Sequence, residues 1–259
     1  MAAKKTQSKR NAKSKTPAGL RLRGKVAVVT GGSRGIGQAI ARVLAAEGCA
    51  VIIAGRDKST LARSATRIGR KVRGRGKVVP LVCDVRDAES VASLFARVKQ
   101  RFRRLDILVN NAGITQPVAS VEETSLEVWH DVIATDLTAI FLCTRAALPL
   151  MKGGATILNN LSAAAVQVFP NYATYSAAKR GALGFTLSLR EEMIPRGIRV
   201  TALMPGATAT DMWDHINPNA PREKMMSVES AAEAVLYAVL LPPNANLSEL
   251  VLTPTGGAL

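Results

Sequence analysis

The sequence is poor in the residues that build disulfide frameworks and metal centres. Its 259 residues include three cysteines, Cys49, Cys83 and Cys143, and two histidines, His130 and His215. The cysteine number is odd, no pair has C-x-x-C spacing, and none has a histidine beside it, so we predict neither a disulfide framework nor a metal site. We expect three reduced, packed thiols in a cytoplasmic protein.

The sequence also has few long apolar runs, and it has no acidic residue near the N-terminus. No stretch is expected to cross a membrane, and the N-terminus lacks the apolar core of a secretory signal. Residues 1–25 hold nine Lys and Arg and no acid, so they supply a large part of the net charge of +16 and leave +7 for the remaining residues. We predict a disordered basic tail over residues 1–23 and one domain over residues 24–259.

Such a tail could bind nucleic acid or an anionic surface through phosphates, or act as a solubilising extension. It contains no aromatic residue suited to stacking on bases. We therefore favour the extension, and we expect neither nucleic acid nor a membrane as a partner.

Short apolar runs of the buried-strand type recur along the chain, at residues 26–30, 50–54, 78–83, 106–110, 155–159, 198–204 and 249–253. Segments long enough for helices separate them. This alternation predicts an α/β fold with a doubly wound parallel sheet of about seven strands and helices on both faces. A hydrophobic content of 47% supplies the core of one such domain.

A glycine-rich turn follows the first of these runs. Gly31, Gly35 and Gly37 stand between residues 26–30 and an apolar-periodic segment over residues 36–48. Glycines let the backbone approach a pyrophosphate, and the amides at a helix N-terminus supply donors for phosphates. The spacing is G-x-x-x-G-x-G, and alone it could also mark a plain turn.

Tyr175 and Lys179 are four residues apart, and Ser162 lies thirteen positions upstream. Residues with this spacing share one face of a helix, so the ammonium can stabilise the phenolate. Tyr172 has Ser176 and not a cation four residues on. An isolated Y-x-x-x-K arises often by chance, but the glycine turn upstream favours an acid/base device for carbonyl chemistry.

Together these motifs resemble the short-chain dehydrogenase/reductase family. Residues 30–37 match that family's cofactor turn, residues 110–113 its Asn-Asn-Ala-Gly segment, and Pro205 with Gly206 its nicotinamide-side turn. The resemblance runs from about Gly24 to the C-terminus. It implies a Rossmann-type fold, a nicotinamide cofactor, and hydride transfer between an alcohol and a ketone or aldehyde.

The resemblance also implies site residues. The catalytic ones are Ser162, Tyr175, Lys179 and, at the position of the family's asparagine, Asp136. Those at the cofactor are Gly31, Ser33, Arg34, Gly35, Ile36, Gly37, Arg56, Asp84, Val85, Asn111, Ala112, Gly113, Tyr175, Lys179, Pro205, Gly206, Thr208 and Thr210. Residues 206–226 correspond to a mobile flap over the substrate, with an ordinary surface loop as the alternative.

The end of the second strand bears on which cofactor is preferred. An NAD site usually places a carboxylate there, whereas the 2′-phosphate of NADP needs cations. Here Gly55 and Arg56 occupy that region, and Arg34 points to it in relatives. Asp57 lies one position beyond the place where an NAD site has its carboxylate, and we expect it to cap a helix. We therefore predict NADP(H) rather than NAD.

In the family's mechanism Ser162 hydrogen-bonds the reacting oxygen, Tyr175 donates or accepts the proton, and Lys179 lowers the pKa of that tyrosine and binds the ribose. Asp136 departs from the family, because it brings a charge near Lys179. We expect an altered pH dependence. The alternative is a catalytically impaired scaffold or regulatory protein, which could bind nucleic acid through the basic tail.

The substrate remains open between a 3-oxoacyl thioester, for a carbonyl reductase of that type, and a small hydroxy acid. The C-terminal residues 248–259 lack the usual acid before their two glycines, which favours the second. Residues 126–151 and 173–193 are long segments with more apolar surface than one sheet can cover. In relatives such helices pair between subunits, so we predict a homotetramer or at least a dimer.

Overall fold

The computed structural model describes residues 20–257, and the first nineteen residues of the expected tail lie outside the described residues. Residues 20–23 are part of the fold, and residues 21–24 form a turn. Leu22 is buried there, and Arg21 pairs with Glu47. The described fold therefore includes residues before Gly24, because this turn packs against the end of the first helix.

The sheet has seven parallel strands in the order β3-β2-β1-β4-β5-β6-β7. The strands are β1 (Val26–Thr30), β2 (Ala50–Gly55), β3 (Lys77–Val82), β4 (Ile107–Asn110), β5 (Thr156–Asn160), β6 (Arg199–Pro205) and β7 (Glu249–Leu252). All seven expected strands are present within about two residues of their predicted bounds, which confirms the doubly wound α/β fold.

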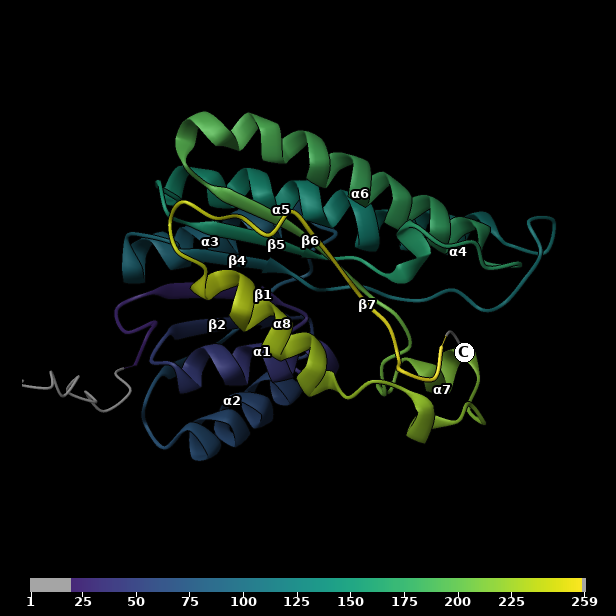
Figure 1. Ribbon diagram of the computed structural model, residues 1–259, viewed down its shortest axis with the longest axis horizontal. Helices are drawn as coiled ribbons and strands as arrows, with labels where there is room; N and C mark the ends of the chain where they lie inside the picture. The colour runs from purple at the N-terminus through teal and green to yellow at the C-terminus, as the bar shows by residue number, and fades with distance from the viewer. Residues whose placement is uncertain (1–19, 258–259) are drawn as a thin grey trace, which may run out of the picture.

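Helices cover both faces of the sheet (Figure 1). They are α1 (Gly35–Ala46), α2 (Lys58–Val72), α3 (Ala88–Phe102), α4 (Leu126–Ile133), α5 (Ala139–Ala147), α6 (Ala173–Met193), α7 (Trp213–Ile216) and α8 (Val228–Leu240). One core joins the sheet to α1, α2 and α8. A second core, on the opposite face, joins it to α3, α5 and α6.

The central strands are apolar because both of their faces are covered. All five residues of β1 are buried, as are all four of β4. Fully burying a Val or Leu side chain contributes about 1.5–3 kcal/mol. At the sheet margins the strands are more exposed: β3 alternates between buried and exposed residues, and β7 between partly buried and exposed ones.

The helical run Leu126–Leu150 bears on the expectation that no stretch crosses a membrane. With a mean hydropathy of 1.4, it is long and apolar enough for a span by length and composition alone. The run comprises α4, the π-helical turn η1 (Ala134–Thr138), α5 and the 3₁₀ turn η2 (Leu148–Leu150). Its buried residues pack against the sheet, as core helices that pass the same test also do.

The strand order positions the site. The chain leaves β1 toward β2 on one side, and β4 lies on the other, so the order reverses beside β1. In open α/β sheets, ligands bind outside the carboxyl ends of the strands at such a reversal. The glycine turn after β1, residues 111–113 after β4, Ser162 after β5 and Gly206 after β6 all lie at this edge.

Candidate active site

The glycine turn is built around two close backbone approaches. Gly31 has φ +64°, and a Cβ there would lie 2.9 Å from the Cα of Ala112. A Cβ on Gly37 would lie 2.4 Å from the carbonyl oxygen of Gly31. No acidic residue occupies the first turn of α1, so its N-terminal amides face the turn without a competing carboxylate.

Side chains link the turn to the ends of β4 and β5. The Thr30 hydroxyl accepts hydrogen bonds from the amides of Asn111, at 2.9 Å, and Ala112, at 3.0 Å. The Asn111 side chain donates to the Thr30 carbonyl at 2.9 Å, and Asn160 donates to the Asn111 side chain at 2.8 Å. Thr30, the first residue of the matched turn, thus has a structural role, and Asn160 is a structural member of the site that the sequence did not single out.

The corner beside β2 has the features expected for a 2′-phosphate. A Cβ on Gly55 would lie 3.9 Å from Ser33 Oγ, so the glycine turn and the end of β2 adjoin. Arg34 and Arg56 are both exposed. Asp57 caps α2, accepting a hydrogen bond from the Thr60 amide, as predicted.

Arg86, just after β3, is a further residue that the sequence did not suggest. Asp84, expected near the adenine, is engaged by Arg86, whose guanidinium donates to both of its carboxylate oxygens. This hydrogen bonding holds the pKa of Asp84 below its usual value. Arg86 also pairs with Asp131 of α4, while Val85 is buried. Arg86 therefore shapes the edge of the expected adenine site.

Tyr175 and Lys179 lie on one face of α6, as predicted. The Lys179 Nζ lies 5.3 Å from the centroid of the Tyr175 ring. Ser162 precedes the 3₁₀ turn η3 (Ala163–Ala165), and its hydroxyl accepts a hydrogen bond from the Ala164 amide. Burial raises the pKa of Tyr175, and the nearby Lys179 ammonium and Ser162 hydroxyl act against that rise.

Tyr172 lies beside this group without sharing its environment. Its ring meets that of Tyr175 edge to face, with centroids 5.9 Å apart. Burial raises its pKa, and the nearby Tyr175 raises it further. No cation lowers the pKa of Tyr172, whereas Lys179 acts to lower that of Tyr175. The two neighbouring tyrosines therefore differ as their sequence spacing predicts.

Asp136 and Lys179 form a buried ion pair. Asp136 Oδ2 lies 3.3 Å from Lys179 Nζ, and the two residues are 0% and 4% exposed. The other carboxylate oxygen accepts a hydrogen bond from the Ile114 amide at 2.9 Å. A Cβ on Gly113 would lie 3.2 Å from that same oxygen, so the absent side chain leaves room for the pair.

The pair also sets the local electrostatics. Burial raises the pKa of Asp136, and Lys179 opposes that rise. Burial alone would lower the pKa of Lys179, but the Asp136 carboxylate reverses this and holds it above its usual value. The same carboxylate raises the pKa of Tyr175 and so counteracts the lysine.

Gln116 is a further residue that the sequence did not single out. It is 1% exposed, and its Oε1 accepts a hydrogen bond from the Tyr175 amide at 2.7 Å. Its Nε2 donates to the carbonyl oxygen of Asn171, a residue with φ +61°. Its only sequence signal is its place three residues beyond the Asn110–Gly113 motif.

Residues 206–226 contain more regular structure than the sequence predicted. They include α7 and the 3₁₀ turn η5 (Arg222–Lys224), and Thr208 forms a β-bridge with Met226. The Trp213 indole donates to the Thr208 carbonyl at 3.0 Å, and Arg222 donates to the Thr210 carbonyl at 2.7 Å. A Cβ on Gly35 would lie 3.4 Å from Thr210 Cγ2, so this segment reaches the glycine turn.

The arrangement suits a dinucleotide beside an acid/base group. A pyrophosphate requires a close backbone approach, as at Gly31 and Gly37, and a helix N-terminus such as that of α1. A second phosphate requires cations, which the two exposed arginines Arg34 and Arg56 supply. Tyr175, Ser162 and Lys179 lie at the same edge of the sheet. The residues present therefore fit a nicotinamide dinucleotide and proton transfer to or from a neighbouring molecule.

Comparisons with known proteins show which proteins this chain resembles. The family model described as short chain dehydrogenase matches residues 25–221. A 3-oxoacyl-[acyl-carrier-protein] reductase of Synechocystis sp. is 39% identical over 198 residues, covering 76% of this chain and 79% of that protein. A short chain dehydrogenase of Burkholderia cenocepacia, solved in complex with NADP, superposes with a TM-score of 0.80 at 31% identity, covering 90% of this chain and 98% of that one. An alcohol dehydrogenase of Thermococcus sibiricus, complexed with 5-hydroxy-NADP, gives a TM-score of 0.80 at 31% identity, covering 89% and 97%.

Proposed function

The chain belongs to the short-chain dehydrogenase/reductase family and is an oxidoreductase that acts on small molecules; from this premise we propose that it interconverts an alcohol and a ketone or aldehyde with NADP(H). The observation that carries the proposal is the grouping of Tyr175, Lys179 and Ser162 beside a glycine turn that fits a dinucleotide. A tyrosine without a cationic neighbour could not exchange protons readily near neutral pH.

Ser162, Tyr175, Lys179 and Asp136 each have a separate role in the proposed proton transfer. The nicotinamide, when bound, supplies or accepts the hydride. Ser162 donates a hydrogen bond to the substrate oxygen, and Tyr175 delivers its hydroxyl proton to that oxygen in reduction and accepts it in oxidation. Lys179 stabilises the phenolate left on Tyr175, and Asp136 fixes the position of the ammonium through the ion pair.

The preference for NADP(H) over NAD(H) rests on charge at the end of β2. Arg34 and Arg56 can contact a 2′-phosphate, and glycine at position 55 leaves no carboxylate to repel it. The Burkholderia cenocepacia protein was solved with NADP, which supports the same preference. Asp84 and Val85 are the residues proposed at the adenine.

The substrate class proposed first is a 3-oxoacyl thioester, because the Synechocystis relative is a 3-oxoacyl-[acyl-carrier-protein] reductase. Apolar side chains beside the catalytic serine agree with an acyl chain, since Val166 and Val168 are 45% and 83% exposed. A small hydroxy acid is the alternative drawn from the C-terminal sequence. Residues 206–226 are proposed to cover the substrate.

A spectrophotometric screen tests both the proposed cofactor and the proposed substrate class. The purified chain is mixed with NADPH or NADH and a panel that includes a 3-oxoacyl thioester, simple ketones and small 2-oxo and 3-oxo acids, and the loss of absorbance is followed. We expect turnover with NADPH and at least one carbonyl, and none after Tyr175→Phe. NADPH binding without turnover on any carbonyl would refute the enzyme and support the scaffold instead.

A further inference from the structure

The positive charge of the folded domain is concentrated in one segment. Residues 56–77 contain nine Lys and Arg and a single acid, Asp57. The other residues from 26 to 259 contain 17 basic and 18 acidic side chains. Outside this segment the domain is therefore close to neutral, and its excess charge is local rather than general.

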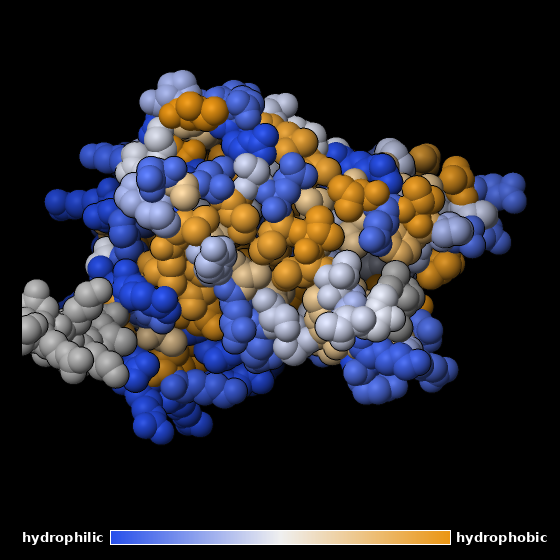
Figure 2. Space-filling model, in the orientation of Figure 1, coloured by the Kyte–Doolittle hydropathy of each residue, from blue (hydrophilic) through white to orange (hydrophobic). Residues whose placement is uncertain are grey.

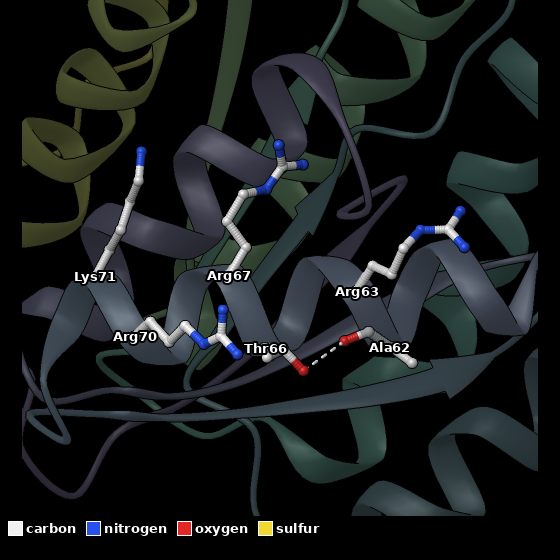
Figure 3. A pocket seen from close by; sticks show the side chains of 6 residues that line it. All are labelled: Ala62, Arg63, Thr66, Arg67, Arg70 and Lys71. Atoms are coloured by element: carbon white, nitrogen blue, oxygen red, sulfur yellow. Dashed lines mark hydrogen bonds between the residues drawn. The ribbon is translucent and has the colours of Figure 1, made fainter.

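The structure places this charge along the exposed side of α2, in the turn that follows and at the first residue of β3. Seven exposed side chains form what we call the α2 basic face: Arg63, Arg67, Arg70, Lys71, Arg73, Arg75 and Lys77. Figure 3 shows Arg63, Arg67 and Lys71 in a row on one side of α2, with Arg70 beside them. The opposite side of the helix is buried through Leu61, Ile68 and Val72.

These cations lack counterions within the domain. None of the seven forms an ion pair with a residue in the described range 20–257. Arg63 donates only to the hydroxyls of Ser59 and Thr60. Seven like charges within one helix and its turn repel one another, so a bound polyanion would be favoured by relief of that repulsion.

The fold also brings the start of the described chain, residues 20–25, to this place. Leu20 packs against Gly48, Arg21 pairs with Glu47, and the Arg75 charge helps to lower the pKa of Glu47 after the Arg21 hydrogen bond. The chain therefore enters the domain beside the C-terminal end of α2. The described residues 20–25 add Arg21, Arg23 and Lys25 and no acid, so the start of the described chain adds positive charge at this end of α2.

The composition of the face selects among anionic partners. Five of its seven cations are arginines, which bind phosphates through paired hydrogen bonds. Residues 56–77 expose no large apolar side chain that could enter a bilayer. Neither these residues nor residues 1–25 contain an aromatic side chain for stacking on single-stranded bases.

We propose that the α2 basic face binds the phosphate backbone of a double-helical nucleic acid without reading its sequence. The row from Arg63 to Lys71 spans about 12 Å along the helix, which matches the roughly 12 Å major groove bordered by two phosphate strands. The sequence alone argued against nucleic acid because stacking residues are missing, but that absence bears on single strands. A duplex is held through its phosphates.

The full-length protein is titrated into a fluorescein-labelled DNA duplex of about 20 base pairs, and anisotropy is followed between about 50 and 200 mM salt. We expect binding that weakens steeply with salt. A variant carrying Arg63→Gln, Arg67→Gln, Arg70→Gln and Lys71→Gln is expected to bind about tenfold or more weakly at the lowest salt, and its log–log salt slope to be shallower by about 3.

A matched variant removes the same charge from the other face of the sheet, through Arg97→Gln, Lys99→Gln, Arg101→Gln and Arg103→Gln on and just after α3. We expect it to bind the duplex nearly as well as the natural chain. Equal losses in the two variants would overturn the proposal, because net charge alone would then explain binding. So would binding to phosphatidylserine vesicles with none to the duplex.

NADPH binding and thermal melting serve as folding checks for both variants, since none of the eight positions lies in the proposed site. If the fourfold α2 variant does not fold, the double variant Arg67→Gln with Lys71→Gln replaces it. That variant is expected to reduce the salt slope by about half as much. An unchanged slope in a folded double variant would count against the face.

Discussion

Asp136 is the buried acid that pairs with the proposed catalytic lysine, Lys179. A buried carboxylate is costly unless a cation and hydrogen bonds compensate, and here Lys179 and the Ile114 amide provide both. The compensation has a chemical consequence. Lys179 is the cation that favours the Tyr175 phenolate, and part of its field is cancelled by the carboxylate 3.3 Å away.

Asp136→Asn should therefore lower the pKa of Tyr175. The carboxylate raises that pKa, so its removal moves the rising limb of kcat/KM for alcohol oxidation toward lower pH. NADP(H) affinity should stay nearly unchanged. Asp131→Asn, which removes an exposed carboxylate five residues upstream, is the control and should leave the profile in place. Identical profiles for Asp136→Asn and the natural chain would show that the two groups are uncoupled.

Arg56→Ala tests cofactor preference at the scale of one side chain. Hydrogen bonds to charged groups contribute about 1.5–3 kcal/mol, so the Kd for NADPH should rise about ten- to a hundredfold. The Kd for NADH, which lacks the 2′-phosphate, should change little. Fluorescence titration with both cofactors measures the difference, and Arg63→Ala serves as a matched arginine outside the site. Equal losses for NADPH and NADH would contradict the assignment.

At the scale of one element, helix α6 depends on a partner from another segment. Its first amides need acceptors, and its N-cap residue, Tyr172, provides no side-chain bond. Gln116 supplies one by accepting from the Tyr175 amide while its amide group holds the Asn171 carbonyl. The residue that orients the catalytic tyrosine thus comes from the loop after β4.

Gln116→Met tests this cap with a side chain of similar shape. It leaves the part-buried Tyr175 amide without this acceptor, which costs about 0.5–1.5 kcal/mol. We expect a lower melting temperature and a lower kcat, with NADPH affinity retained, because the glycine turn is untouched. Gln100→Met, at an exposed position of α3, is the control. A kcat equal to that of the control would show that the bond does not orient Tyr175.

At the scale of the whole molecule, the apolar surface is more extensive than a single domain needs. Leu126, Trp129 and Phe141 along α4 and α5 are 75%, 42% and 46% exposed. Phe141 also packs edge to face against Phe185 of α6, with ring centroids 6.3 Å apart. Figure 2 shows further apolar residues gathered over the region of α8 and the edge strand β7. Exposed apolar patches of this kind are typical of subunit interfaces.

We predict a homotetramer, or at least a dimer, held in part by α4, α5 and α6. Light scattering at micromolar concentration should give a mass that is a multiple of the 27.4 kDa chain. Phe141→Lys should lower that mass by placing a charge in the interface, whereas Val82→Lys, at an equally exposed site near the opposite edge of the sheet, should not. A monomeric mass for the natural chain would refute the prediction.

The sequence by itself determined the fold class and the order of the site's motifs. Buried parallel strands such as Val26–Thr30 are continuous apolar runs, and the glycine turn and the Tyr175–Lys179 spacing are local patterns. Local patterns can be recognised in the sequence because they depend on residues that are neighbours along the chain. The helix cap at Asp57 was predictable for the same reason.

Only the tertiary structure decided which distant residues meet. Nothing in the sequence predicted the Gln116 cap on Tyr175, the engagement of Asp84 by Arg86, or the entry of the chain beside α2. These contacts join separate segments, and close packing of helices on the sheet selects them. The apolar run Leu126–Leu150 makes the same point, since its composition fits a membrane span and its packing against the sheet makes it a core element.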